Sequence, residues 1–386
     1  MSKAILPGAT IGVLGGGQLG RMLAIAARTL GYHVSALDPD RSCAARYVVD
    51  HCIAASFSDV QAAVDLAKHS DVVTLEIEKV STDAMRAVDR FVPMRPAARV
   101  LDIVQDRAAQ KRWLEDAGFP VGPFAVVRSA AELARAAKKL KSACFVKATR
   151  GGYDGRGQVE IASHEEAARA WKELGAEECV VEKALSIGAE ISVLVARRPS
   201  GQMAVHPPAL NHHTDRILEY SVIPAPISER LAKRAADIAR DAARKLEVEG
   251  LLVVELFLTE DGELLVNELA PRPHNTFHGT EIGCPTSQFE QAVRAICDLP
   301  LGSTELVRPV AIYNLLGDLW KARPPSFERA LTIPGVRLHL YGKRDARPGR
   351  KMGHLSAAAA TPEEAVALVK LARAELASPT KKSKRA

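Results

Sequence analysis

Hydrophobic residues in the first hundred positions form short continuous runs that alternate with amphipathic stretches. The apolar runs at residues 10–15, 33–38 and 71–78 predict strands, and the stretches at 18–31 and 59–70 have the period of helices. Strands alternating with helices of this length are typical of a parallel sheet with crossover helices. The sequence therefore predicts a small doubly wound domain at the N-terminus.

The pattern changes after residue 93. The segment "PMRPAARV" interrupts the alternation, and residues 102–120 predict one helix closed by Gly118 and Pro120. From there to about residue 300, helices mix with hairpin-like strand pairs, which suits an α+β domain, and an alanine-rich helix is expected from about 361 to 376. We expect three domains, which cover residues 1–97, 98–305 and 306–386.

The first strand runs into a glycine-rich loop. Gly15, Gly17 and Gly20 have GxGxxG spacing, a helix follows, and the second strand ends at Asp38. This arrangement is typical of dinucleotide-binding folds, so a dehydrogenase is the first hypothesis.

A second glycine-rich loop favours a different function. The strand that carries Lys147 leads into Gly151, Gly152, Gly155 and Gly157 and then into another strand. A loop between two strands fits neither a dinucleotide fold nor a GxxxxGK[ST] loop. Glycine backbones can bring several amides onto one anion, so we expect a flap over a triphosphate with Lys147 as a fixed positive charge. The alternative is a plain glycine-rich hairpin.

The segment "LLVVELFLTEDGELLVNELAPR" predicts a hairpin around Asp261 and Gly262. A two-residue turn there places Glu260 opposite Glu263 and, counting back along both strands, Glu255 opposite Glu268. Two adjacent carboxylates in apolar surroundings need a shared proton or a cation. Oxygen ligands of this kind suit magnesium, although two solvated glutamates at a sheet edge remain an alternative.

Composition narrows the class of protein without naming its function. The chain has 386 residues, 47% hydrophobic and 25% charged, which is ordinary for a globular protein, and no apolar run approaches the length of a membrane helix. We therefore expect no membrane partner. The terminal "KKSKRA" supplies +4 of the net charge of +6, so the basic charge is poor evidence for nucleic-acid binding and we expect no nucleic-acid partner. Six scattered cysteines argue against zinc or disulfides. The absence of a leader predicts a cytoplasmic protein.

These elements together resemble the ATP-grasp carboxylase-ligases, and among them the family of 5-(carboxyamino)imidazole ribonucleotide synthases. The resemblance covers about residues 10 to 357 through "GGGQLGRM", "TRGGYDGRGQ", "NELAPRPHNTFH", "SQFEQAVRAICDLPLG" and "RPGRKMGHL". It implies an ATP-grasp fold of mixed α/β and α+β class, preceded by a Rossmann-like domain and followed by a small C-terminal domain. In this family the first glycine loop holds the ribonucleotide substrate, through its amides and the helix N-terminus, instead of a dinucleotide.

The resemblance implies a reaction in two steps. ATP phosphorylates bicarbonate to carboxyphosphate, and the carboxyl group then moves to the amine of 5-aminoimidazole ribonucleotide, giving ADP and phosphate. ATP and Mg²⁺ are the expected cofactors, aminoimidazole ribonucleotide and bicarbonate the substrates, and a homodimer the expected assembly.

The resemblance also implies roles for particular residues. For magnesium it implies Glu255 and Glu268. For the ATP phosphates, adenine and ribose it implies Arg107, Lys147, Gly152, Tyr153, Asp154, Gly155, Arg156, Gly157, Gln158, Glu182, Lys183, Ala184, Leu185, Glu190, His213, Asn267 and Glu268. For the ribonucleotide it implies Gly17, Gln18, Leu19, Glu76, Tyr153, Arg156, Lys343, Arg350 and Lys351. For catalysis it implies Asp154, as the group that orients or deprotonates the amine, and Arg272, His274 and Asn275 around carboxyphosphate.

Two positions depart from the family pattern. Lys79 stands where an asparagine is usual, and Arg216 stands where a glycine is usual, so that a loop built on a positive φ would need rebuilding. The alternatives are an ATP-grasp ligase with another acceptor, such as a formate-using glycinamide ribonucleotide transformylase or a biotin carboxylase, and a non-catalytic nucleotide-binding relative.

Overall fold

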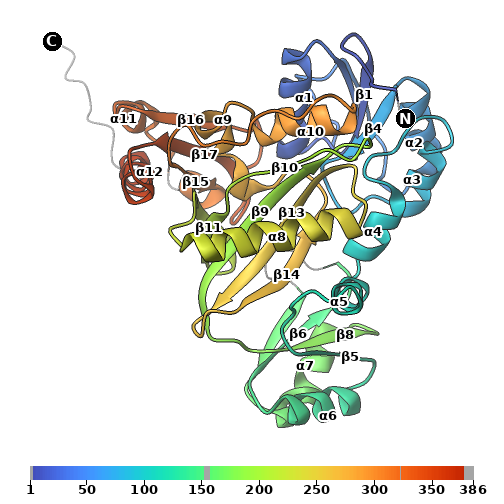
Figure 1. Cartoon of the computed structure of the whole chain (residues 1–386), viewed down its shortest axis with the longest axis vertical. Helices are drawn as coiled ribbons and strands as arrows, with labels where there is room; N and C mark the ends of the chain where they lie inside the picture. Colours follow the sequence, from blue (N-terminus) through green and yellow to red (C-terminus); the bar gives the residue numbers. More distant parts are fainter. Residues whose placement is uncertain (1–2, 152–156, 322, 378–386) are drawn as a thin grey trace.

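The computed structural model describes residues 3–151, 157–321 and 323–377. Three sheets organise these residues: a small parallel sheet, a small antiparallel sheet and a large sheet between them (Figure 1). The flap residues Gly152, Tyr153, Asp154, Gly155 and Arg156 and the basic tail after residue 377 lie outside the described residues. No helix in the described part is long and apolar enough to span a membrane.

The N-terminal part is the doubly wound domain that the sequence predicts. Its four strands are parallel in the order β3-β2-β1-β4. Short β3 and helix α3 were not predicted. The elements are β1 (Thr10–Leu14), α1 (Gln18–Thr29), β2 (His33–Leu37), β3 (His51–Ile53), α2 (Val60–Lys68), β4 (Val72–Leu75) and α3 (Thr82–Val88).

The single helix predicted over residues 102–120 is wrong. Two helices occupy this region, α4 (Ala98–Val104) and α5 (Arg107–Asp116). The Asp106 carboxylate accepts hydrogen bonds of 3.0 Å from the N–H groups of Ala108 and Ala109, which makes it the N-cap of α5. Because an N-cap residue is not helical, the chain turns here and α5 starts in a new direction.

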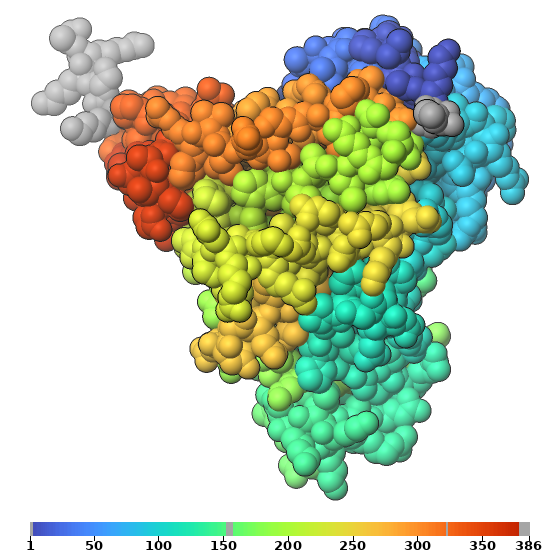
Figure 2. Space-filling model, in the orientation of Figure 1, coloured from blue at the N-terminus to red at the C-terminus, as the bar shows by residue number. Residues whose placement is uncertain are grey.

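The antiparallel sheet forms a lobe that protrudes from the molecule (Figure 2). Its strand order is β5-β8-β6-β7, and α6 and α7 pack on it through a core that includes Leu133, Val146 and Val181. The elements are β5 (Phe124–Val127), α6 (Ala130–Leu140), β6 (Cys144–Ala148), β7 (Gln158–Ile161), the short helix η1 (His164–Glu166), α7 (Ala167–Leu174) and β8 (Cys179–Lys183).

The large sheet has the order β14-β13-β9-β11-β12-β15-β17-β16, with β10 added beside β9. Strand β12 pairs with β15, so the C-terminal segment extends this sheet and does not build one of its own. The strands are β9 (Ile187–Arg197), β10 (Met203–Val205), β11 (Ala209–Thr214), β12 (Ile217–Ile223), β13 (Gly250–Thr259), β14 (Leu264–Ala270), β15 (Val310–Leu316), β16 (Val336–Leu340) and β17 (Lys351–Ala358).

Helices cover both faces of the large sheet. Val193 and Val254 point toward α8 on one face, and Leu194 and Val253 point toward α10 on the other, because alternate residues of a strand face opposite sides. Helix α1 packs against α10, which joins the N-terminal domain to the large sheet through one apolar core. The helices are α8 (Glu229–Lys245), η2 (Asn275–Phe277), α9 (Thr280–Gly283), α10 (Gln288–Ile296), η3 (Gly317–Trp320), α11 (Phe327–Leu331) and α12 (Pro362–Ala377).

Candidate active site

The predicted acid pair is present on the hairpin of β13 and β14. Glu255 lies directly opposite Glu268, as expected. The predicted turn is wrong, because Thr259 pairs with Glu263 and residues 260–262 form a three-residue loop with Gly262 at a φ of 86°. A bulge at Asn267 shifts the register back by one residue and restores the glutamate pair.

The two glutamates differ in their electrostatic surroundings. Burial has the largest single effect on Glu255 and opposes its charge, but His274, whose Nε2 lies 3.2 Å from Glu255 Oε1, acts with the charges of His213 and Arg272 to lower the pKa of Glu255. For Glu268, desolvation by the surrounding protein atoms has the largest effect, and the charges of Glu255 and Glu78 add to it. Together they raise the pKa of Glu268 to about 7. The pair therefore holds a proton near neutral pH unless a cation replaces it.

We expect this proton to be visible in the stability of the cation-free protein. The pKa of Glu268 is raised on folding, so its stabilising effect is complete below the ordinary carboxyl value and disappears as the pH rises through about 7. The variant Glu268→Gln should therefore melt at an increasingly higher temperature than the unchanged protein between pH 5.5 and pH 8 in EDTA. Thermal unfolding at a series of pH values measures this difference. Glu263→Gln, next to the exposed turn, is the control. If the melting temperatures of Glu268→Gln and the unchanged protein changed in parallel with pH, the raised pKa of Glu268 would be contradicted.

Lys147 forms an ion pair with a carboxylate where β6 leads into the flap. Its Nζ lies 2.6 Å from Glu182 Oε2, and Lys111 Nζ lies 3.2 Å from Glu182 Oε1. Burial opposes the charge of Glu182, but the two ammonium groups outweigh it and lower its pKa. Lys111 is not among the predicted site residues, although it lies on α5 one turn after Arg107 and so on the same helix face.

The end of β8, which was expected to bind adenine through its backbone, has its N–H groups already in use. The N–H groups of Lys183 and Ala184 are already donated to the carbonyls of Pro123 and Ala143, at 3.0 and 2.8 Å. They are not free to bind a base, so only the carbonyl groups of these two residues and the backbone of Leu185 could do so.

The flap joins two paired strands, as predicted. Lys147 is in register with Gln158, and the Ala148 N–H donates to the Gly157 carbonyl at 2.9 Å. Gly151 and Gly157 both have a positive φ, at 85° and 69°, which suits glycine at the two ends of the loop. Arg107 reaches the same place, because its guanidinium donates to the Ala148 carbonyl at 2.8 Å.

The predicted ribose contact lies on β9 and β11. His213 Nδ1 is 2.9 Å from Glu190 Oε2; burial disfavours the charged imidazole, but Glu190 outweighs it and raises the pKa of His213. Nearby, Asp215 and Arg216 form a two-residue hairpin loop with φ values of 50° and 66°. The loop is therefore not rebuilt, since Arg216 itself adopts the left-handed conformation expected of a glycine.

Residues of the "PRPHN" segment gather next to the acid pair. Arg272 Nε lies 3.0 Å from Glu78 Oε1, which ties the hairpin to the N-terminal domain. His274 is held at its backbone, where Gln288 accepts from its N–H and donates to its carbonyl. Asn275 is buried, and neither amide atom has a hydrogen-bond partner among the described residues. An unsatisfied buried amide is uncommon, so Asn275 is a candidate to bind a water molecule or a ligand.

The first glycine loop is organised differently from the expectation. Glu76 accepts hydrogen bonds from Gly17 and Gly20 at 2.8 and 3.1 Å, and Asp38 accepts one from Gly16 at 2.8 Å. The amides expected to bind substrate are thus occupied by the protein's own carboxylates. Glu76 is buried and supports the loop through these hydrogen bonds. A carboxylate in this place also disfavours a pyrophosphate, which removes the basis for the dehydrogenase hypothesis.

Loss of the Glu76 carboxylate should weaken the N-terminal domain. Glu76→Ala leaves two amides without an acceptor, and each costs about 1–3 kcal/mol, so we expect a loss of about 2–6 kcal/mol in the free energy of unfolding. Chemical denaturation measures it. Asp83→Ala, at an exposed site of the same domain, should change the value by less than about 0.5 kcal/mol. Equal effects of the two changes would contradict the role of Glu76.

Two predicted substrate-binding residues from opposite ends of the chain are in contact. Lys343 Nζ donates to Gln18 Oε1 at 2.6 Å and to the carbonyl of Lys351 at 2.7 Å. Arg350 lies on the same loop and donates to the Asp345 carbonyl at 2.9 Å. Leu19 is buried beside Gln18 at the start of α1. Lys343 therefore lies at the N-terminus of α1, and Arg350 lies on the same loop as Lys343.

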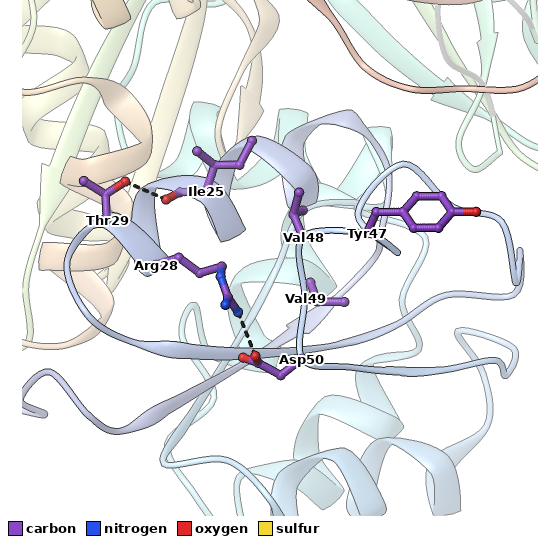
Figure 3. A pocket seen from close by; sticks show the side chains of 7 residues that line it. All are labelled: Ile25, Arg28, Thr29, Tyr47, Val48, Val49 and Asp50. Carbon is purple, nitrogen blue, oxygen red and sulfur yellow. Dashed lines mark hydrogen bonds and ion pairs between the residues drawn. The ribbon is translucent and has the colours of Figure 1, made fainter.

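A surface hollow lies at the other end of α1 (Figure 3). Arg28 pairs with Asp50 across it at 2.7 Å, and the exposed Tyr47 points away from it. No predicted site residue lines this hollow, so it is separate from the candidate active site. Its lining residues are Ile25, Arg28, Thr29, Tyr47, Val48, Val49 and Asp50.

Three family models match consecutive parts of the chain. They are the ribonucleotide synthetase preATP-grasp domain at residues 8–105, the ATP-grasp domain at 112–289, and the phosphoribosylaminoimidazole carboxylase C-terminal domain at 310–367. Fold and site together define an ATP-grasp ligase. An N5-carboxyaminoimidazole ribonucleotide synthase from Bacillus subtilis is 41% identical over 357 residues, which cover 92% of this chain and 93% of the relative. The chain belongs to the N5-carboxyaminoimidazole ribonucleotide synthase family.

Further relatives and solved structures agree with this assignment. The synthase from Brucella melitensis is 40% identical over 92% of this chain and 98% of its own. The ADP complex of an N5-carboxyaminoimidazole ribonucleotide synthetase superposes with a TM-score of 0.92 at 41% identity, covering 97% of this chain and 98% of that one. The Aspergillus clavatus enzyme in complex with ADP and 5-aminoimidazole ribonucleotide superposes with a TM-score of 0.87 at 32% identity, covering 95% and 98%.

Proposed function

We propose that this protein carboxylates 5-aminoimidazole ribonucleotide with bicarbonate and ATP, forming 5-(carboxyamino)imidazole ribonucleotide, ADP and phosphate. One observation carries the proposal: the opposed carboxylates of Glu255 and Glu268 lie beside His274 and within reach of the charge of Arg272. This cluster combines a cation site with an oxyanion site. An enzyme that phosphorylates bicarbonate needs both.

ATP would lie between the flap and the hairpin. Lys147 and Arg107 supply positive charge near the phosphates, and Glu190 offers carboxylate oxygens to the ribose hydroxyls. The donor set at Glu255 and Glu268 fits Mg²⁺, a hard cation that takes carboxylate oxygens together with phosphates. When bound, Mg²⁺ neutralises charge on the phosphate oxygens during transfer.

Bicarbonate and carboxyphosphate would lie beside Arg272, His274 and Asn275. A guanidinium can bind a planar oxyanion through two parallel hydrogen bonds, and Glu78 orients that of Arg272. The unsatisfied amide of Asn275 supplies a further donor. Attack of a bicarbonate oxygen on the terminal phosphorus releases ADP; attack of the amine nitrogen on the carboxyl carbon then releases phosphate. Asp154 in the flap would receive the proton of the amine.

The ribonucleotide would lie between α1 and the loop before β17. Lys343, Lys351 and Arg350 are the candidates for its phosphate, and Gln18 for its ribose. Gly17 and Glu76 keep a supporting role, because Glu76 occupies the loop amides. We also propose that the protein is cytoplasmic and that it is a homodimer, as the family resemblance implies for the dimer. Light scattering after gel filtration tests the dimer.

The test follows both the nucleotide and the carbon. The purified protein is mixed with ATP, Mg²⁺ and ¹³C-bicarbonate, with and without 5-aminoimidazole ribonucleotide, while ADP release and the ¹³C signal of a carbamate are recorded. We expect ADP and carbamate in equal amounts, and only when the ribonucleotide is present. ADP release that depends on glycinamide ribonucleotide, or ATP binding without turnover, would overturn the proposal.

A further inference from the structure

Two of the six cysteines touch each other. Cys43 Sγ and Cys52 Sγ are 3.8 Å apart, close to van der Waals contact. Cys43 lies in the loop after β2 and is buried, whereas Cys52 lies on β3 at the edge of the parallel sheet and is partly exposed. The partly exposed thiol can meet a small solute, and the buried one lies directly behind it.

The pair lies against the first glycine loop. A Cβ built on Gly16 would come within 2.5 Å of Cys43 Sγ, so this sulfur lies directly on the Gly16 backbone. The Ala45 N–H donates to the Gly16 carbonyl at 2.8 Å, and Arg21 donates to the Ala44 carbonyl at 3.0 Å. A movement of Cys43 is therefore transmitted to the loop and to α1, where Gln18 lies.

Cys52 is the most acidic thiol of the six. The hydrogen bond from Cys43 comes first and the charge of Arg46 adds to it, which lowers the pKa of Cys52 to about 7 despite its partial burial. Burial raises the pKa of the four thiols elsewhere, to about 11 at Cys179 and Cys284 and about 12 at Cys297, and upward at Cys144. Only a thiolate attacks oxidants readily, so oxidation is directed to Cys52.

We propose that Cys43 and Cys52 form an oxidative modification site, at which hydrogen peroxide produces a reversible disulfide beside the substrate loop. The Cys52 thiolate attacks one peroxide oxygen, breaks the O–O bond and, with a proton, yields a sulfenic acid and water. The Cys43 sulfur then attacks Cys52 Sγ, its proton leaves with the hydroxyl as a second water, and the S–S bond forms. Two thiols are oxidised, and one peroxide is reduced.

The disulfide changes the loop because its bond is shorter than the present contact. A bond of about 2.05 Å brings the sulfurs about 1.8 Å closer than the 3.8 Å observed. Cys43 belongs to a segment without helix or strand, so it moves toward β3 and away from Gly16. This consequence rests on the proposed function: we expect the KM for the ribonucleotide to rise several-fold on oxidation, while the KM for ATP stays constant.

Peptide mapping tests the modification without any activity measurement. Trypsin cuts after Arg41 and Arg46, so Cys43 and Cys52 fall on different peptides, residues 42–46 and 47–68. After a stoichiometric dose of hydrogen peroxide and blocking of free thiols, we expect the two peptides to be linked and dithiothreitol to separate them. In Cys43→Ser, Cys52 should instead collect a dimedone adduct, and Cys297→Ser should link like the unchanged protein.

The possible results distinguish formation of the disulfide from its effect on the substrate loop. Both cysteines blocked as free thiols, or Cys52 oxidised to a sulfinic acid without a link, would overturn the modification site. A complete link with an unchanged KM for the ribonucleotide would overturn its effect on the loop. Absence of ligase activity in the reduced protein would instead count against the proposed function, because the peptide link does not depend on it.

Discussion

Replacing Glu268 by glutamine is expected to lower the rate of ADP release by about 10³-fold with ATP binding retained. The change keeps the shape of the side chain but removes one of the two charges that face each other across β13 and β14. Loss of one preorganised electrostatic group commonly costs about 10²–10³-fold, and the loss of cation affinity adds to this. A coupled assay of ADP release measures the rate, and quenching by a fluorescent ATP analogue measures binding.

Glu263→Gln is the matched control for this prediction. It removes the same charge from the exposed turn of the same hairpin, outside the acid pair, and should leave the rate within about two-fold. If Glu268→Gln retained more than a tenth of the activity, the acid pair would not be the cation site.

Replacing Lys343 by alanine is expected to raise the KM for the ribonucleotide about 10–100-fold and to leave the KM for ATP unchanged. Lys343 Nζ lies between Gln18 and the Lys351 carbonyl, where it faces the N-terminus of α1. A hydrogen bond to a charged group contributes about 1.5–3 kcal/mol, which corresponds to this range. Steady-state kinetics with each substrate varied in turn separates the two effects.

Lys321→Ala is the control for Lys343. Lys321 is also basic and C-terminal, but it is exposed and pairs with Asp318 at 2.8 Å, apart from α1. It should leave both KM values unchanged. An equal rise in both KM values for Lys343→Ala would indicate a distorted fold and contradict a specific role for Lys343.

Local patterns in the sequence were sufficient for much of the fold and for the position of the acid pair. The parallel sheet, the glycine flap between two strands and the pairing of Glu255 with Glu268 follow from periodicity and turn residues. The flap and the glutamate hairpin depend on residues close together in the chain. The pairing was predicted correctly from a wrong turn, because the bulge at Asn267 cancels the extra loop residue, and a bulge has no reliable local pattern.

Contacts between residues far apart in the sequence decide which groups bind the first glycine loop, and the sequence alone did not predict them. Glu76 takes the amides of Gly17 and Gly20 from 56 and more residues away, and Lys343 reaches Gln18 across 325 residues. A pattern of residue types shows that a glycine loop can bind an anion, but it cannot show which anion accepts the hydrogen bonds of the loop in the folded protein. The pairing of β1 with β4 brings Glu76 to the glycine loop. The packing of α1 against α10 and the extension of the large sheet through β15, β17 and β16 bring Lys343 to Gln18. The ligands of the first glycine loop are therefore a property of the folded chain, because side chains far apart in sequence compete for the same few amides.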